Sequence, residues 1–241
     1  MNNPDLSLVV ACYNEGTHLL YSIREIEEVM GQTKYSYEFI FIDDQSKDDT
    51  RELIKKICQT RSNCRFLFHE KNVGRGGTVR EGLLAAHANY AGFLDIDLEV
   101  PARYIPAMVL WLERGYDMVS VERIERFSFN PYKLLRFIFS EGCKKIVLSF
   151  LGTSFPDSAA GFKFFNMSSM REVVDHTKDV GWFWDTEVVL KSEMAHKKLK
   201  SVRGVFEHRL DKKSTVRLIP DTIAYLRAIR NFKKNEQKSN L

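Results

Sequence analysis

The 241-residue sequence has no apolar run approaching the roughly 18–20 residues needed to span a bilayer. Residues 1–5 have neither the basic start nor the apolar core of a secretory leader. The four cysteines are scattered and form no CxxC pair, which favours reduced thiols over a disulfide framework. Together these absences predict a cytoplasmic protein without a spanning helix of its own.

The common nucleotide-binding glycine motifs are also missing. The glycine-rich residues 72–77 match neither GxGxxG nor GxxxxGK(S/T), so the sequence supports neither a dinucleotide site nor a P-loop. One interpretation of this segment is a tight turn that packs a helix against a sheet. The other is a contact between Arg75 and a phosphate, and both interpretations stay open.

The composition is that of an ordinary globular protein, with 44% hydrophobic and 28% charged residues. The length suits one sizeable α/β domain, which we expect to occupy residues 1–241. Residues 1–120 carry 13 basic and 18 acidic side chains, a net charge of −5, whereas residues 121–241 carry 23 and 14, a net charge of +9. The basic second half suits an anionic partner, although lysine-rich helices are commonly just solvated surfaces.

Apolar runs alternate with helical periodicity through the first half of the chain. Strands are predicted at residues 6–13, 37–42, 65–68 and 90–94, each followed by a helix, and a fifth strand at 118–121. This alternation predicts a doubly wound, mostly parallel α/β sheet flanked by helices. Ligands of such sheets bind beyond the carboxyl ends of the strands.

Acidic side chains follow the fourth predicted strand at alternating positions, as Asp95, Asp97 and Glu99. If the strand continues through them, all three point to one side. Clustered carboxylates suit a hard cation such as Mg²⁺ or Mn²⁺. The alternative is a solvated acidic turn before Pro101.

Polar residues also end the first two predicted strands. Tyr13, Asn14 and Glu15 follow the first, and Asp43 and Asp44 follow the second. Because the ends of parallel strands share one edge of a sheet, these side chains and the acids after the fourth strand are expected to meet in one crevice.

These strand-end motifs together resemble the family 2 glycosyltransferases, which have the GT-A fold. Residues 9–15 are similar to the family's opening motif, residues 41–50 to its VDDxSxDxT motif, residues 72–76 to its NxGxxxA turn, and residues 95–97 to its DxD metal motif. The proline usual after the first strand is absent, since Ala11 or Cys12 stands there. The resemblance covers about residues 1–125 and implies that this half binds a nucleotide-sugar donor.

The resemblance implies roles for the matching residues. Asp43 and Asp44 would hold the nucleotide base and ribose, while Asp95 and Asp97, with Glu99, would hold a divalent metal, Mg²⁺ or Mn²⁺. Such a metal neutralises the leaving nucleoside diphosphate, and Asp97 would be catalytic. The donor-binding residues implied are Ala11, Tyr13, Asn14, Glu15, Asp43, Asp44, Arg75, Asp95, Ile96 and Arg123.

From residue 121 onwards the resemblance narrows to the polyprenyl-phosphate glycosyltransferases, the group of dolichol-phosphate mannose synthase. Residues 121–123, 157–163 and 184–187 are similar to that group's GSR, DxxxGF(K/R) and aromatic-acid motifs. Arg136 and Ser140 match RxxxS, while Arg209 and Ser214 resemble RxxxxSK with Thr215 where the lysine is expected. The acceptor-binding residues implied are Arg136, Ser140, Lys163, Asp185, Glu187, Arg209 and Ser214, of which Arg136 would also be catalytic.

Two basic amphipathic stretches, residues 130–151 and 221–234, lie in this acceptor-binding half. Such segments can lie in a membrane interface, or they can simply cover the core with a charged outer face. We expect a peripheral protein at the cytoplasmic face of a membrane, which reaches its lipid through these helices or a small membrane protein partner. No nucleic-acid partner is expected.

The resemblance implies inverting, metal-dependent transfer of a sugar from a UDP- or GDP-sugar to a polyprenyl phosphate. A phosphate monoester is mostly dianionic near neutral pH, so it needs cations to hold it rather than a strong base. If the acceptor is instead a hydroxyl of a polysaccharide or glycan, a carboxylate base is required, with Asp157 the first candidate and Asp185 the second. A nucleotide-binding scaffold with a dead site is a third interpretation.

Overall fold

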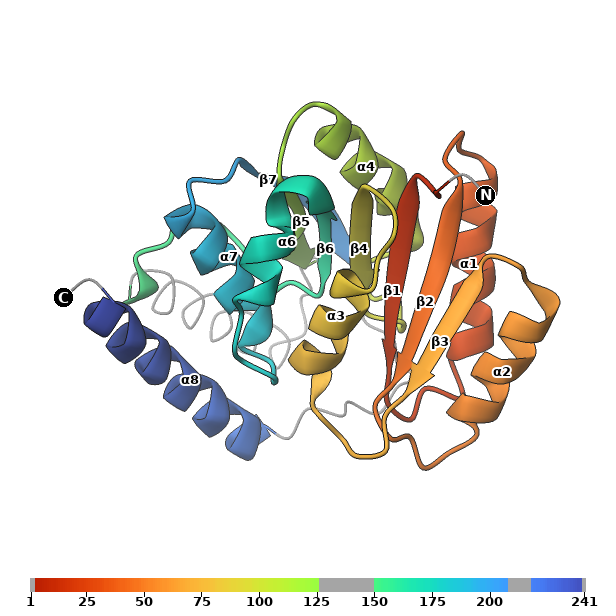
Figure 1. Cartoon of the computed structure of the whole chain (residues 1–241), viewed down its shortest axis with the longest axis horizontal. Helices are drawn as coiled ribbons and strands as arrows, with labels where there is room; N and C mark the ends of the chain where they lie inside the picture. Colours follow the sequence, from red (N-terminus) through yellow and green to blue (C-terminus); the bar gives the residue numbers. More distant parts are fainter. Residues whose placement is uncertain (1–2, 126–149, 208–217, 240–241) are drawn as a thin grey trace.

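The computed structural model describes residues 3–125, 150–207 and 218–239 of the chain. Within them, a seven-stranded sheet lies between two layers of helices (Figure 1). The strands follow the order β3-β2-β1-β4-β6-β5-β7 across the sheet. Their bounds are β1 (Leu6–Cys12), β2 (Tyr37–Asp43), β3 (Cys64–Phe68), β4 (Tyr90–Leu94), β5 (Met118–Glu125), β6 (Phe162–Asn166) and β7 (Leu199–Phe206).

The sheet is parallel except at β6. β1 pairs in parallel with β2 and β4, and β2 pairs in parallel with β3. β6 lies antiparallel between β4 and β5, and β7 pairs in parallel with β5. The predicted mostly parallel α/β sheet is therefore confirmed. Strands from both halves of the chain build this one sheet. The division of the chain into a donor-binding and an acceptor-binding half near residue 125 stays a prediction.

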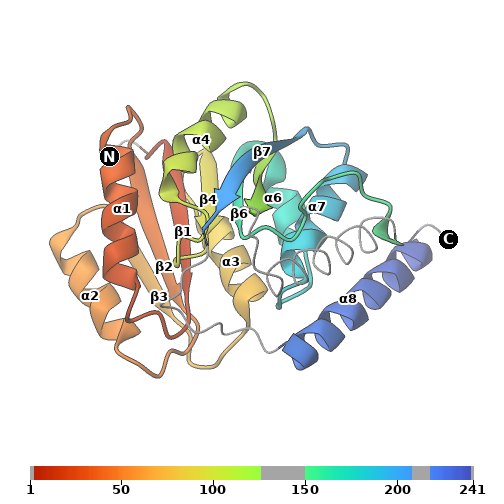
Figure 2. The same ribbon diagram turned by 180° about the vertical axis from the view of Figure 1, so that it is seen from behind.

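Helices cover both faces of the sheet, which makes it doubly wound. α1, α2 and α4 lie on one face and α3, α6 and α7 on the other, as the two opposite views in Figures 1 and 2 show. The helix bounds are α1 (Leu19–Gly31), α2 (Thr50–Thr60), α3 (Arg75–Leu84), α4 (Ile105–Glu113), α6 (Met167–Asp175), α7 (Trp184–Met194) and α8 (Leu218–Ser239), with a short 3₁₀ turn at Ala102–Tyr104 before α4.

A hydrophobic core fills each side of the sheet. Alternate residues of β1 divide between the two cores: Leu6, Leu8 and Val10 pack on the α1 side, and Val9 packs on the α3 side. Burying one such aliphatic side chain contributes about 1.5–3 kcal/mol. Because both faces of β1 and β2 are covered, these strands are apolar almost throughout, and only their ends carry polar side chains.

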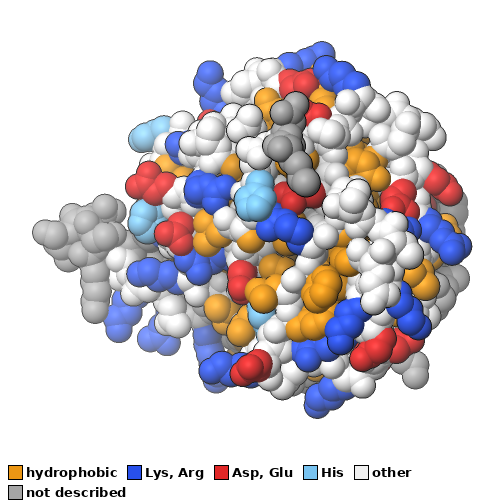
Figure 3. All heavy atoms as spheres, turned by 45° about the vertical axis from the view of Figure 1, so that its right-hand side comes forward, with side chains coloured by type: hydrophobic (Ala, Val, Ile, Leu, Met, Phe, Trp, Pro, Cys, Tyr) orange, Lys and Arg blue, Asp and Glu red, His pale blue; other side chains and the backbone are white. Residues whose placement is uncertain are grey.

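β3 forms one edge of the sheet and leaves Phe66 and Leu67 exposed. The cationic groups of Arg51 and Lys55 on α2 lie over the Phe68 ring, 5.3 and 5.5 Å from its centroid. Figure 3 brings this side of the molecule forward and shows apolar side chains interspersed with basic and acidic ones. Charges of this kind beside an edge strand disfavour its pairing with another sheet.

α8 packs one face against α7 and leaves the other uncovered by the described residues. Ile229 is buried with Phe183 and Leu190 of the α7 region, whereas Ile223 and Leu226 are exposed. This confirms an amphipathic helix where residues 221–234 predicted one; most of the other stretch, 130–151, lies outside the described residues. No helix in the described ranges is both long and apolar enough to cross a membrane.

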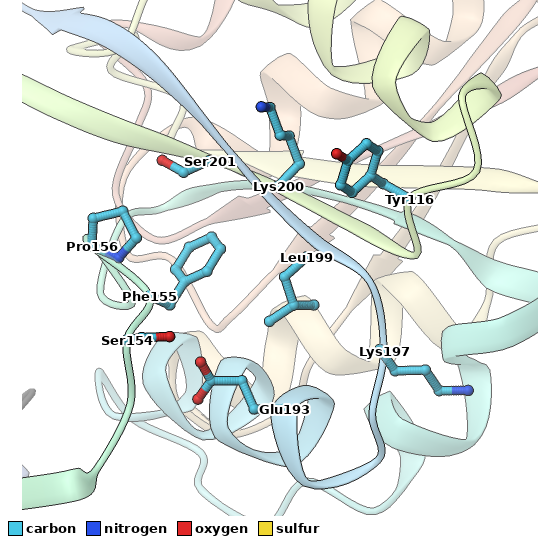
Figure 4. A pocket seen from close by; sticks show the side chains of 9 residues that line it. All are labelled: Tyr116, Ser154, Phe155, Pro156, Glu193, Lys197, Leu199, Lys200 and Ser201. Carbon is cyan, nitrogen blue, oxygen red and sulfur yellow. The ribbon is translucent and has the colours of Figure 1, made fainter.

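A shallow cavity of about 490 Å³ lies between β7, the end of α7 and the segment before Asp157 (Figure 4). It is lined by Tyr116, Ser154, Phe155, Pro156, Glu193, Lys197, Leu199, Lys200 and Ser201. Tyr116 precedes β5 and Leu199 begins β7, so the cavity lies towards the amino ends of these strands, away from the strand ends that carry the acids. None of the predicted site residues that the structure describes lines it.

Candidate active site

The carboxyl ends of β1, β2 and β4 bring the predicted donor-binding residues to one edge of the sheet. β1 lies between β2 and β4 and runs parallel to both, so the loops that follow the three strands are neighbours. Each loop contains a non-glycine residue in the left-handed region: Asn14 (φ 57°), Gln45 (φ 65°) and Leu98 (φ 52°). Such conformations are costly, especially for leucine, and gather at functional sites. The sequence pattern did not indicate them.

The first two loops are tied to each other by hydrogen bonds. The Asn14 backbone N–H donates to Ser46 Oγ at 2.8 Å, and the Lys47 N–H donates to Asn14 Oδ1 at 2.8 Å. The Glu15 N–H donates to Thr50 Oγ1 at 2.9 Å. Asn14 therefore joins the two loops through both its backbone and its side chain, and Glu15 joins them through its backbone. Ala11 and Tyr13 flank the same turn, with Tyr13 exposed.

Asp43 ends β2 with a fully buried carboxylate. Its Oδ2 accepts from the Ser46 N–H at 3.0 Å and from Arg51 Nε at 2.5 Å. Its Oδ1 has no hydrogen-bond partner among the described residues. A buried carboxylate oxygen without a donor costs free energy, so this atom is suited to accept from a bound ligand.

Asp44 instead holds the glycine-rich loop. Its Oδ1 accepts from the Val73 N–H at 2.7 Å and its Oδ2 from the Gly74 N–H at 2.9 Å. Gly74 has a φ of 93°, which only glycine adopts readily, and it directly precedes α3. His69 lies 2.9 Å from both Asp44 Oδ1 and Glu81 Oε2; although burial acts to lower the pKa of His69, the two carboxylates raise it. Residues 72–74 form a loop held by Asp44, and residues 75–77 are the first turn of α3, which packs on the sheet. The nucleoside role of Asp44 stays a prediction.

The three acids after β4 lie in a turn rather than in a continued strand. β4 ends at Leu94, and the Leu98 N–H donates back to the Asp95 carbonyl at 3.0 Å. Ile96 and Leu98 are nevertheless buried, and the three acids are more exposed. Buried and more exposed residues therefore alternate along this turn, as predicted. The Glu99 N–H donates to Asp97 Oδ1 at 3.3 Å.

A preformed cluster of three carboxylates is not present here. In residues 3–125, 150–207 and 218–239, no group of three or more His, Cys, Asp or Glu side chains is placed to hold a metal ion. Asp95 and Asp97 remain as hard oxygen donors on the open side of the turn, and these suit Mg²⁺ or Mn²⁺ when a ligand's phosphate oxygens complete the shell. The metal-binding roles of Asp95, Asp97 and Glu99 stay predictions.

Arg75 bridges a predicted donor-binding residue, Asp95, and a predicted acceptor-binding residue, Asp185. Its Nε and Nη2 donate to Asp95 Oδ1 at 3.1 and 2.6 Å, and its Nη1 donates to Asp185 Oδ2 at 2.5 Å. Burial acts to lower the pKa of Arg75, but Asp185 and Asp95 raise it above its usual value. The second interpretation of the glycine-rich loop, a phosphate contact, stays open because Arg75 is here engaged by carboxylates.

Asp185 and Lys163 form a buried pair behind Arg75. Asp185 Oδ1 lies 3.7 Å from Lys163 Nζ, and both side chains are almost inaccessible to solvent. Burial raises the pKa of Asp185, although Arg75 and Lys163 oppose the shift. Burial lowers the pKa of Lys163 to about 8, against the attraction of Asp185 and Asp157. Lys163 also donates to the Ala160 carbonyl oxygen and so fixes the turn before β6.

Asp157 is bound by Arg123 at the end of β5. Arg123 Nε donates to Asp157 Oδ2 at 2.8 Å, its Nη2 donates to Oδ1 at 3.0 Å, and its backbone N–H donates to Oδ2 at 3.1 Å. Burial acts to lower the pKa of Arg123, but Asp157 raises it. To act as a general base, Asp157 would first have to break this bidentate ion pair with Arg123.

Residues 7–174 match a family model described as Glycosyl transferase family 2. The chain belongs to this family. The resemblance found in the strand-end motifs is thereby confirmed. The match includes all the strand ends of the crevice, Asp157 and Lys163, and it ends before Asp185.

Two curated relatives of this family 2 chain are glycosyltransferases. Glycosyltransferase AglD of Haloferax volcanii is 26% identical over 196 residues, which are 79% of this chain and 31% of that protein. The dolichyl-phosphate β-glucosyltransferase of Dictyostelium discoideum is 27% identical over 208 residues, which are 78% of this chain and 62% of that protein. The chain thus spans between about a third and three fifths of the length of these curated relatives.

A solved structure of the same fold is glucosyl-3-phosphoglycerate synthase from Mycobacterium tuberculosis, in complex with Mn²⁺, UDP and phosphoglyceric acid. It matches the family 2 chain with a TM-score of 0.65 at 15% identity, over 94% of this chain and 76% of that one. At this identity the likeness shows the fold, and it confirms the GT-A architecture that the motifs implied.

Other predicted acceptor residues of the family 2 chain fall in different places. Glu187 is buried and accepts from the backbone N–H groups of Lys178 and Asp179 at 2.7–3.0 Å, so it holds a loop of the protein. This engagement does not favour the acceptor contact predicted for Glu187. Four predicted residues, Arg136, Ser140, Arg209 and Ser214, lie outside the described residues.

Lys163 gives the stability of this family 2 chain a definite pH dependence. Its pKa is about 8 in the folded protein, below the ordinary lysine value of 10.5, so the unfolded chain binds more protons between these pH values. The free energy of unfolding therefore gains from Lys163 as pH rises through this window. From pH 7.5 to 9.5, wild type should gain about 2 kcal/mol relative to Lys163→Met in paired urea unfolding curves. A difference that stays flat or shrinks with pH would contradict the buried ammonium.

Proposed function

We propose that the protein transfers a sugar from a UDP- or GDP-sugar to a polyprenyl phosphate, with inversion and with a divalent metal. The observation that supports this proposal is that predicted donor-binding and acceptor-binding residues meet through Arg75 at the carboxyl ends of the strands. Asp43 ends β2, and Asp95 and Asp97 follow β4, with β1 between these two strands. Arg75 links Asp95 to Asp185, which also lies beside Lys163. Partly exposed acids that adjoin a group of cations suit a metal–diphosphate donor and an anionic acceptor.

The donor side supplies positioning groups from the chain itself. Oδ1 of Asp43 is buried without a hydrogen-bond donor, and we assign it to a donor group of the base or ribose, while Asp44 holds the adjoining turn. Asp95 and Asp97 would hold Mg²⁺ or Mn²⁺, which when bound supplies positive charge to the leaving diphosphate. The structure of the Mycobacterium synthase with Mn²⁺ and UDP supports this choice of ligands for the fold.

The acceptor side favours a phosphate over a hydroxyl. A hydroxyl acceptor needs a carboxylate base, yet Asp157 is held by Arg123, and Asp185 is held by Arg75 beside Lys163. A phosphate dianion needs no base, and cations that can turn from these carboxylates towards it would orient it. The dolichyl-phosphate β-glucosyltransferase among the relatives supports the lipid acceptor.

The uncovered face of α8 supports placement at a membrane surface. Ile223 and Leu226 are exposed on it, and Arg227 and Arg230 are exposed in the next turn. Apolar side chains with flanking basic ones suit the headgroup region of an anionic membrane, here proposed to be its cytoplasmic face. Binding of the protein to anionic liposomes tests this part of the proposal. We expect the liposomes to retain the protein at low salt and to retain less of it as salt rises, and no retention at low salt would refute the proposal.

The test of the reaction is a radiolabelled transfer assay with a panel of UDP- and GDP-sugars. Each reaction contains Mn²⁺ or Mg²⁺ and a short polyprenyl phosphate, and label is counted in the organic phase. The matched control replaces the lipid by the same polyprenol without its phosphate. We expect organic-phase label with one nucleotide sugar, only with metal and only with the phosphorylated lipid.

Two outcomes would replace the proposal. If the organic phase stays empty while added glycans release nucleoside diphosphate, the acceptor is a hydroxyl, and Asp157→Asn becomes the next variant. If the protein binds a nucleotide sugar yet transfers its sugar to no acceptor, the chain is a nucleotide-binding scaffold.

A further inference from the structure

The guanidinium of Arg75 divides its donors unequally between two carboxylates. Two of them, Nε and Nη2, converge on a single oxygen, Oδ1 of Asp95, and the third, Nη1, reaches Oδ2 of Asp185. The Nε–Nη2 edge is one that can bind two oxygens of a carboxylate or phosphate in parallel. Here that edge is occupied by one oxygen of a residue that also belongs to the DxD motif.

The two carboxylates differ in how firmly they are placed. Asp185 is buried and has Lys163 as a second cation, whereas the Asp95 side chain is 46% exposed. The rings of Trp182 and Phe93 also lie 5.2 and 5.6 Å from the Arg75 guanidinium. Losing the contact with Asp95 would therefore leave Arg75 anchored by Asp185 and by the aromatic rings.

Asp95 cannot serve a divalent cation fully while Arg75 competes for it. An oxygen that accepts two charge-assisted hydrogen bonds from a guanidinium is a weaker ligand for a second cation, because the two positive charges repel each other. The structure thus records Asp95 with Arg75 as its positive partner.

We propose that Arg75 is a stand-in cation, which neutralises Asp95 until metal and donor bind and then turns its Nε–Nη2 edge to a phosphate. This inference rests on the proposed function only in the identity of the phosphate-bearing ligands. Asp95 passes from Arg75 to the metal, and Arg75 keeps its contact with Asp185. The exchange couples the donor side to the acceptor side, because the same guanidinium touches both carboxylates.

The test measures binding rather than turnover. Mn²⁺ affinity is measured by calorimetry without nucleotide, and then UDP and GDP affinity is measured in saturating Mn²⁺, for wild type and Arg75→Gln. The matched control is Arg80→Gln, which removes an arginine of the same helix that pairs with the exposed Asp175. Arg75→Gln should bind Mn²⁺ alone about tenfold more tightly, the size of one charge-assisted hydrogen bond, and bind the preferred nucleotide about tenfold less tightly.

The opposite directions of these two changes distinguish partner exchange from damage to the fold, which would weaken both affinities. Because Arg75→Gln leaves Asp185 with one cation fewer, the pair Arg75→Gln with Asp185→Asn is measured alongside it and should keep the gain in Mn²⁺ affinity. Equal Mn²⁺ binding by wild type and both variants, absence of binding included, would overturn the exchange. A transfer assay that fails on every lipid while the two affinities still move apart would refute the lipid acceptor and leave the exchange standing.

Discussion

Asp97→Asn is expected to lower the transfer rate by about 10²- to 10³-fold, since a metal that neutralises a leaving diphosphate supplies several kcal/mol. The asparagine oxygen can still accept from the Glu99 N–H, as Asp97 Oδ1 does at 3.3 Å. The turn after β4 should therefore persist while one negative charge is lost. The measurement is the initial rate of label transfer at saturating donor, as a function of Mn²⁺ concentration.

The control for this variant is Asp175→Asn, which removes an exposed carboxylate at the end of α6 that pairs with Arg80. It should retain the wild-type rate. If Asp97→Asn kept its rate and its dependence on Mn²⁺, the DxD motif would have no part in the metal site.

Gly161→Ala is expected to lower the transfer rate by about a hundredfold, because small displacements of positioned groups have effects of this size. A Cβ at Gly161 would lie 2.0 Å from Asp95 Oδ2 and 2.6 Å from Arg75 Nη2, so the ion pair must move. The Gly161 carbonyl also accepts from the Asp95 N–H at 3.1 Å. The rate and the Mn²⁺ affinity are both measured, and both should fall.

Gly31→Ala is the matched control for Gly161→Ala. Gly31 ends α1, and a Cβ there would meet nothing within 4 Å. It should leave the rate unchanged and, if anything, stabilise the helix slightly. If Gly161→Ala kept the wild-type transfer rate and Mn²⁺ affinity, the close packing of residue 161 on Asp95 would not be needed for either.

The parts of the fold that the sequence predicted are those set by local pattern. The apolar runs at residues 37–42 and 90–94 became β2 and β4, because buried parallel strands need apolar side chains on both faces. The convergence of Asp43 and Asp95 followed from the parallel topology alone. The turn after β4 was harder to foresee, since Leu98 takes a positive φ that no leucine pattern indicates.

The parts that the sequence could not predict depend on contacts between distant segments. Arg75 and Asp185 are 110 positions apart, and nothing in either neighbourhood shows that they meet. The pairing of Arg123 with Asp157 likewise changed the interpretation of Asp157, which its motif made the first candidate for a carboxylate base. Gly161 matched a motif, yet only the packed structure explains why a side chain there would strike Asp95.

A crystal structure with UDP or GDP and Mn²⁺, with diffraction data collected at the manganese absorption edge, would locate the metal and the nucleotide. The account predicts an anomalous peak beside the carboxylates of Asp95 and Asp97, with the diphosphate next to it and the nucleoside towards Asp43. It also predicts that the Nε–Nη2 edge of Arg75 has left Asp95. Manganese held by other residues, or a nucleotide bound away from the ends of β1, β2 and β4, would contradict it.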